Sequence, residues 1–232
     1  MFLGIANAAE AGHEPLATIF GIEISAYVTS MWIVMAALIL VSYFATRNMK
    51  WLATGLQNAI ELVVEMLLDF LSGIMGEEKA KKYFPYLATV FLFILTMNYC
   101  SLLPLSGTLP WLTTPTATLS VTVGLALCTF FVTHFYGIKE RGLAYFKHLF
   151  QPYFFLFPLN VIDEIVKPLS LSLRLFGNIF GEKMIGMTLF SMIPLIVPLP
   201  AYFLGILFGA IQAYVFTLLS AVYISNATAK DH

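Results

Sequence analysis

Residues 152–192 read PYFFLFPLNVIDEIVKPLSLSLRLFGNIFGEKMIGMTLFSM, an apolar stretch that nevertheless carries six charged side chains. These are Asp163, Glu164, Lys167, Arg174, Glu182 and Lys183. A helix from residue 160 to residue 192 would be about 50 Å long, whereas the hydrocarbon core of a bilayer is about 30 Å thick. We therefore expect this helix to tilt or bend in a membrane, and Pro168 favours a bend because proline lacks the helical N–H donor.

The composition makes lipid the expected solvent of the chain. Of its 232 residues, 59% are hydrophobic and 11% are charged, whereas soluble domains carry about 25% charged residues. The formal net charge is −1, so no basic surface for nucleic acid is expected. Cys100 and Cys128 lie in apolar stretches without metal-ligand spacing, and we expect neither a metal nor another cofactor.

The hydropathy pattern predicts an all-α membrane protein, a single multi-pass domain over residues 1–232 with five transmembrane crossings. The expected crossings are at about 25–46, 84–103, 116–138, 155–192, which is the tilted one, and 200–225. Basic residues follow the first, third and last crossings and precede the second. The positive-inside rule then places the N-terminus outside and the C-terminus in the cytoplasm.

A polar stripe marks a further helix at about 55–75. Gln57, Glu61, Glu65 and Asp69 recur every four residues among aliphatic neighbours, which predicts an amphipathic helix. It either lies in the membrane plane with a solvated acidic face or docks a partner protein.

Arg174 is the residue that most strongly indicates a functional site. An arginine near the bilayer midplane costs several kcal/mol or more and persists only beside a cavity, a carboxylate or a pore. Arginine does not release its proton, so it can block proton passage and hold a carboxylate ionised. That carboxylate belongs either to another subunit or to an internal ion pair with Asp163, Glu164 or Glu182.

Four segments resemble one family, subunit a of the F-type ATP synthase membrane sector. They are KPLSLSLRLFGN (167–178), LGILFGAIQAYVFTLLSAVYIS (204–225), NAIELVVEML (58–67) and PTATLSVT (115–122). The resemblance implies a stator that presses a long tilted helix hairpin against a rotor ring and offers two aqueous half-channels. The implied partners are the c-subunit ring, the peripheral stalk b subunits and the lipid bilayer, in a bacterial inner membrane rather than an organellar one.

Individual residues follow from this resemblance. Arg174 matches the essential arginine, Gln212 matches the glutamine opposite it, and Ser170 and Asn178 match polar positions one turn either side. The family often has a glutamate nine residues after the arginine, whereas here Lys183 takes that place and Glu182 is eight residues after Arg174. Gly205 replaces a frequent histidine or acid. We include Glu182, Lys183, Glu164 and Asp163 with the ion-translocation candidates. Glu182 either relays ions or forms an anchoring ion pair with Lys183.

Two other classes of protein fit the sequence less well. An independent secondary transporter would use intramembrane charges in a similar way, but no internal repeat is visible. An intramembrane enzyme would need a nucleophile–base pair or metal-ligand spacing, and neither appears. His134 and His148 are typical of interfacial histidines rather than proton carriers. The coupling ion, a proton or sodium, is not encoded in these motifs.

Overall fold

A computed structural model describes residues 15–19, 22–47, 55–100, 115–142, 145, 157–192 and 198–229. Within these residues there are six α-helices, a short 3-10 helix and one β-hairpin. The helices are α2 (Ala26–Thr46), α3 (Leu56–Met75), α4 (Glu77–Cys100), α5 (Leu119–Arg141), α7 (Phe157–Met192) and α8 (Pro198–Ala227), with η1 at Pro115–Ala117.

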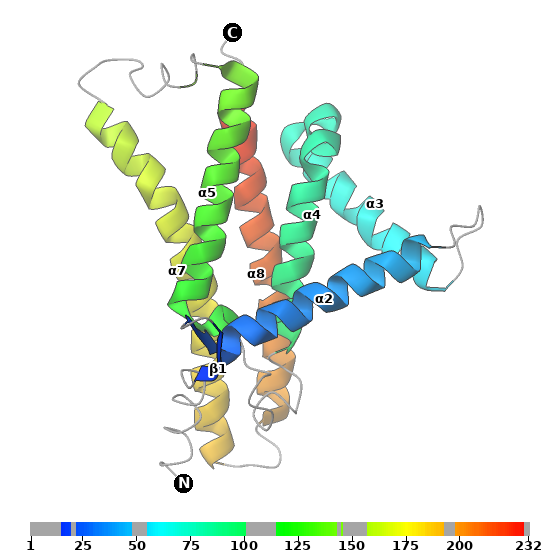
Figure 1. Cartoon of the computed structure of the whole chain (residues 1–232), viewed down its shortest axis with the longest axis vertical. Helices are drawn as coiled ribbons and strands as arrows, with labels where there is room; N and C mark the ends of the chain where they lie inside the picture. Colours follow the sequence, from blue (N-terminus) through cyan, green and yellow to red (C-terminus); the bar gives the residue numbers. More distant parts are fainter. Residues whose placement is uncertain are drawn as a thin grey trace.

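The helices form a bundle with an arm (Figure 1). Figure 1 shows α4, α5 and α8 upright, α7 inclined to them, and α2 and α3 reaching out to one side. The lower ends of α7 and α8 project beyond the other helices, and α8 ends with Ala227 at the opposite end of the bundle. We call the end at which α8 terminates the C-end of the bundle.

Four helices of the described residues are long and apolar enough to cross a membrane: Ala26–Thr46, Glu77–Cys100, Leu119–Arg141 and Phe203–Ala227. The expectation of an all-helical membrane fold is thereby confirmed. Helix α7 is 36 residues long, but its charged residues distinguish it from these four. That α7 also crosses the bilayer, which would make five crossings in total, stays a prediction.

The β-hairpin before α2 was not expected from the sequence. Strand β1 (Pro15–Ile19) pairs antiparallel with β2 (Ile22–Ser25), and Ile19 stands opposite Ile22. The hairpin contains four β-branched residues, which favour strands: Thr18, Ile19, Ile22 and Ile24. Strands of five and four residues are too short to stand out in a hydropathy pattern dominated by long apolar runs.

Helix α4 begins earlier than the crossing expected from residue 84. Its first turn contains Glu77 and Glu78, which stabilise the positive end of the helix dipole. Glu77 also lies 3.8 Å from Lys81, one turn later. The helix therefore begins among charged side chains, before its apolar part. Residues 101–103 and 155–156 of the expected crossings, as well as His148, lie outside the described residues.

Helix α3 packs its apolar face against the bundle. Leu71 is fully buried in a cluster with Tyr83, Leu87 and Ile224, which come from α4 and α8. The opposite face carries the acidic stripe, and Gln57 donates a 2.8 Å hydrogen bond to Glu61 there. This division of faces is the one that an amphipathic helix requires. Its position in the membrane plane stays a prediction.

Candidate functional site

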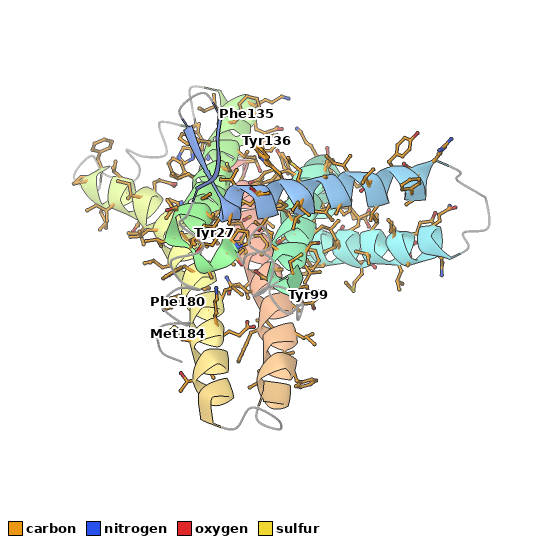
Figure 2. All side chains as sticks on the ribbon, turned by 60° about the horizontal axis from the view of Figure 1, so that its bottom comes forward. Tyr27, Tyr99, Phe135, Tyr136, Phe180 and Met184 are labelled. Atoms are coloured by element: carbon orange, nitrogen blue, oxygen red, sulfur yellow. The ribbon has the colours of Figure 1, made fainter. Side chains whose placement is uncertain are left out.

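Helix α7 has one face in the bundle and one outside it. Its buried side chains include Leu171, Leu175 and Ile179, spaced at one turn, so they form one stripe. Arg174 belongs to the exposed face. The large apolar side chains exposed on the same helix include Leu169, Leu173, Phe180 and Met184. Figure 2 shows Phe180 and Met184 on the part of α7 that projects with α8 beyond the other helices.

An amide pair joins α7 to α8 one turn beyond Arg174. Nδ2 of Asn178 donates a 2.5 Å hydrogen bond to Oε1 of Gln212. Gln212 is 1% exposed, and its Nε2 has no hydrogen-bond partner among the described residues. The structure therefore brings two of the predicted site residues together and leaves a buried N–H donor beside them.

In the described part of the chain, Arg174 has no carboxylate partner. Within the described residues no Asp or Glu lies within 4.0 Å of its guanidinium, and these residues include Asp163, Glu164 and Glu182. Glu164 is hydrogen-bonded to Nζ of Lys167 instead. The internal ion pair that the sequence left open for Arg174 is absent from this part of the chain.

The remaining predicted residues are distributed along α7. Asp163 is exposed, while Ser170, Glu182 and Lys183 are half-buried. No ion pair links Glu182 to Lys183 in the ranges that the structure describes. Over these ranges, no group of three His, Cys, Asp or Glu side chains could hold a metal ion.

Asn98 is a polar residue that the sequence analysis did not single out. Its Nδ2 donates a 3.1 Å hydrogen bond to the backbone carbonyl of Gly209, and this bond ties α4 to α8 inside the bundle. A Cβ atom on Gly209 would lie 3.2 Å from Cβ of Asn98, so the close approach depends on glycine. An amide within an apolar span was the available signal, since such groups seek partners on neighbouring helices.

Further polar contacts gather at the C-end. Lys82 on α4 forms an ion pair with Glu140 on α5. The hydroxyl of Tyr83 lies 3.2 Å from the same carboxylate. Lys79 donates a 3.3 Å hydrogen bond to the carbonyl of Thr228, just beyond α8. These contacts fasten the ends of three helices to one another.

Comparisons with known proteins show the family of the chain. The sequence model of the family described as ATP synthase A chain matches residues 28–225. ATP synthase subunit a of Moorella thermoacetica is 45% identical over 206 residues, which cover 88% of this chain and 91% of that protein. The chloroplastic subunit a of Oedogonium cardiacum is 42% identical, over 87% of this chain and 81% of that protein.

A third relative is ATP synthase subunit a of Geobacter sulfurreducens, which is 40% identical over 87% of this chain and 86% of that protein. Similarity of this extent rules out the alternative that the chain is an independent secondary transporter. The chain belongs to the ATP synthase subunit a family, and it is a multi-pass membrane protein that acts as the non-catalytic, ion-translocating stator subunit of the membrane sector.

Proposed function

We propose that Arg174 is the fixed cation past which the ring's ion-binding carboxylates move. The observation that carries this proposal is an exposed arginine with no carboxylate partner in the described part of the chain. In low dielectric, an opposite charge keeps a passing carboxylate ionised. The same charge repels a proton or a sodium ion that would otherwise leak straight across.

The other site residues divide between the two sides of Arg174. Gln212 and Asn178 shape the contact next to it, because Nε2 of Gln212, which has no hydrogen-bond partner among the described residues, is a donor for a carboxylate or water. Ser170 lies one turn before it. Glu182 and Lys183 belong to the outer half-channel, while Glu164 and Asp163 belong to the inner one.

In this proposal the chain crosses the membrane five times, with α7 as the tilted fourth crossing and α3 in the plane of the cytoplasmic surface. The N-terminus is outside and the C-terminus is cytoplasmic, as the basic residues indicate. The membrane is a bacterial inner membrane. The C-end of the bundle then faces the cytoplasm.

The partners follow from the exposed faces. The apolar stripe of α7 around Arg174 packs against a ring of c subunits, since a charge in such a stripe needs a polar partner in lipid. The peripheral stalk b subunits hold the chain against rotation. The outward arm of α2 and α3 offers surface for them (Figure 1).

Replacing Arg174 tests the proposal. Arg174→Ala should abolish ATP synthesis driven by an ion gradient in vesicles, while the complex still assembles. A membrane potential of 100 mV supplies about 2.3 kcal/mol per elementary charge, so a leak beside the ring would dissipate the gradient. We expect at least a 100-fold loss of synthesis and an increased passive ion flux.

Lys81→Ala is the matched control, because it removes an exposed cation whose ion-pair partner among the described residues is Glu77, with Nζ and Oε2 3.8 Å apart. Its synthesis rate should stay within twofold of the wild type. A wild-type rate in correctly assembled Arg174→Ala complex would refute the proposal.

A further inference from the structure

Helices α4 and α8 lie side by side and run in opposite directions (Figure 1), and two polar contacts share one register between them. Close to the end of α4, Nδ2 of Asn98 donates a 3.1 Å hydrogen bond to the carbonyl of Gly209. At the C-end, Nζ of Lys79 donates a 3.3 Å hydrogen bond to the carbonyl of Thr228. Positions 79 and 98 differ by 19, and so do positions 209 and 228. The register therefore holds over about 28 Å of helix.

Between these two contacts the interface is apolar. Its buried side chains include Leu87, Phe91 and Ile94 on α4, and Phe216 and Ile224 on α8. Apolar attraction is not directional, whereas a hydrogen bond requires a set distance and angle. The polar contacts therefore fix the position of α8 more narrowly than the apolar side chains do. A single buried asparagine fixes the register of coiled-coil helices in the same way.

Asn98 makes the inner one of the two contacts. It is 2% exposed, whereas the contact of Lys79 is only partly buried. A hydrogen bond is electrostatically stronger in the low dielectric of the interior than in water. The acceptor of Asn98 is also a backbone carbonyl, which cannot change rotamer as a side chain can. The bond to Gly209 therefore constrains α8 itself, both in its rotation about its axis and in its depth.

The constrained carbonyl lies one turn before Gln212. Residues three apart are neighbours on a helix surface, so Gly209 and Gln212 move together when α8 turns or slides. Gln212 is 1% exposed and accepts the 2.5 Å hydrogen bond from Asn178 of α7. Asn178 is one turn beyond Arg174. A continuous series of contacts thus runs from Asn98 on α4, through α8, to the turn of α7 next to Arg174.

We propose that Asn98 is a positioning residue for Gln212, because its bond to Gly209 sets the rotation of α8 and thereby holds the Gln212 amide against Asn178. The proposal rests on the function proposed above, in which ring carboxylates move past Arg174. In this scheme α4 is a fixed support for α8 while the ring turns. Lys79 supplies the second point of attachment, at the C-end.

The competing interpretation is that Asn98 only stabilises the bundle. Its loss would then lower the amount of assembled complex. In the complex that does assemble, however, Gln212 would keep its position opposite Asn178. The experiments below therefore measure assembled complex only, and the assembled amount is determined separately.

The first experiment measures the position of Gln212 by cross-linking. In a background with Cys100 and Cys128 replaced, Asn178→Cys and Gln212→Cys are joined by a short bifunctional thiol reagent. We expect Asn98→Leu and Asn98→Ala each to lower the yield at least fivefold, because both remove the amide. Leucine overfills the site and alanine leaves a void, so an effect of only one variant would reflect packing and would overturn the proposal. Loss of assembly in both variants would support the competing interpretation.

Tyr86→Phe is the matched control. The hydroxyl of Tyr86 donates a 2.9 Å hydrogen bond to Oγ1 of Thr129, so this variant removes a bond from α4 to α5 and leaves the bond from Asn98 to Gly209 in place. Its cross-linking yield should stay within twofold of the parent. A loss as large as that of the Asn98 variants would show that any loosening of α4 has this effect, and Asn98 would have no specific role.

The second experiment is a double-mutant cycle on gradient-driven ATP synthesis. Asn98→Leu alone should lower synthesis at least tenfold. Added to Gln212→Leu, it should lower synthesis less than twofold further, because the residue through which Asn98 acts is already gone. Independent effects multiply, so a multiplied loss would show that Asn98 does not act through Gln212. Cross-linking does not depend on synthesis, so it decides between the interpretations even where Gln212→Leu is inactive.

The two proposals fail separately. If the Asn98 variants cross-link like the parent while Arg174→Ala abolishes synthesis, Asn98 is not a positioning residue, and the proposed role of Arg174 stands. If Arg174→Ala retains synthesis, the proposed function is wrong, whatever the cross-linking yield.

Discussion

At the scale of single residues, a hydrogen bond between two amide side chains joins α7 to α8, and no ion pair links these helices among the described residues. The 2.5 Å hydrogen bond from Asn178 to Gln212 is neutral, so it leaves the charge of Arg174 uncompensated. In a low dielectric, that charge acts over a longer range than it would in water. A neutral contact next to a cation that has no carboxylate partner among the described residues therefore suits a site that must attract a carboxylate from outside the chain.

Glu182 offers a test on the other side of Arg174. It is half-buried and lies about 12 Å further along α7. If it relays ions, Glu182→Gln should slow gradient-driven transport at least tenfold without loss of assembly. Gly205→Glu on α8 should then restore part of the rate, because it supplies a carboxylate from the facing helix. Transport assays with reconstituted complex measure both effects.

Two results would contradict this role of Glu182. Normal transport in Glu182→Gln would exclude a relay. Loss of activity that follows loss of assembled complex would instead support a structural role. The amount of subunit a that copurifies with its complex separates these outcomes.

At the scale of elements, the contact between α4 and α8 depends on Gly209. Its substitution by alanine would place a methyl group 3.2 Å from Cβ of Asn98 and 3.5 Å from the Tyr99 ring. Such overpacking typically costs about 1–3 kcal/mol. We expect Gly209→Ala to lower the melting temperature of the detergent-solubilised subunit by several degrees.

Gly124 provides the matched control for this change. It lies within α5, and a Cβ added there meets nothing within 4 Å. Alanine is favoured over glycine by about 1 kcal/mol in a helix interior, so Gly124→Ala should leave the melting temperature unchanged or raise it. Equal destabilisation by both variants would show that the Gly209 contact contributes nothing specific.

The elements were largely predictable, whereas their contacts were not. Apolar runs predict α2, α4, α5 and α8 because lipid demands about 20 apolar residues per crossing, and a four-residue polar period predicts α3. The bond from Asn98 to Gly209 joins residues 111 apart in sequence. Likewise, His134 approaches Glu164 only because α5 packs against α7. Such pairs depend on how each helix is oriented about its own axis, and the hydropathy pattern does not specify that orientation.

The site was predictable only in part for the same reason. Arg174 is conspicuous because an arginine in an apolar run is costly, and Glu164 and Lys167 are neighbours on one helix face. Glu164 also lines two cavities to which α5, α7 and α8 contribute side chains. The location of these cavities required the tertiary structure.

At the scale of the whole molecule, the direction of the chain in the membrane can be tested. In a background without Cys100 and Cys128, we expect Gly107→Cys to react with an impermeant thiol reagent in intact cells. Lys230→Cys should react only in inverted vesicles. Both positions lie outside the described residues, and they are chosen from the distribution of basic side chains.

The opposite labelling pattern would reverse the orientation. It would also exchange the two half-channels, so that Glu182 would face the cytoplasm. The protein without Cys100 and Cys128 and with no introduced cysteine is the control for background labelling.

The polar contacts at the C-end should respond to salt more strongly than the polar contacts in the interior of the bundle. The ion pairs found among the described residues, such as Lys82 with Glu140, lie at that end and are partly exposed. The hydrogen bonds donated by the amide side chains of Asn98 and Asn178 are instead neutral. Dissolved ions screen exposed charges beyond about 8 Å at physiological ionic strength, but they do not weaken a neutral bond in the interior. Rising ionic strength on the C-end side of the membrane would therefore weaken the ion pairs between the helix ends there. It would leave the hydrogen bond between Asn178 and Gln212, beside Arg174, unchanged in strength.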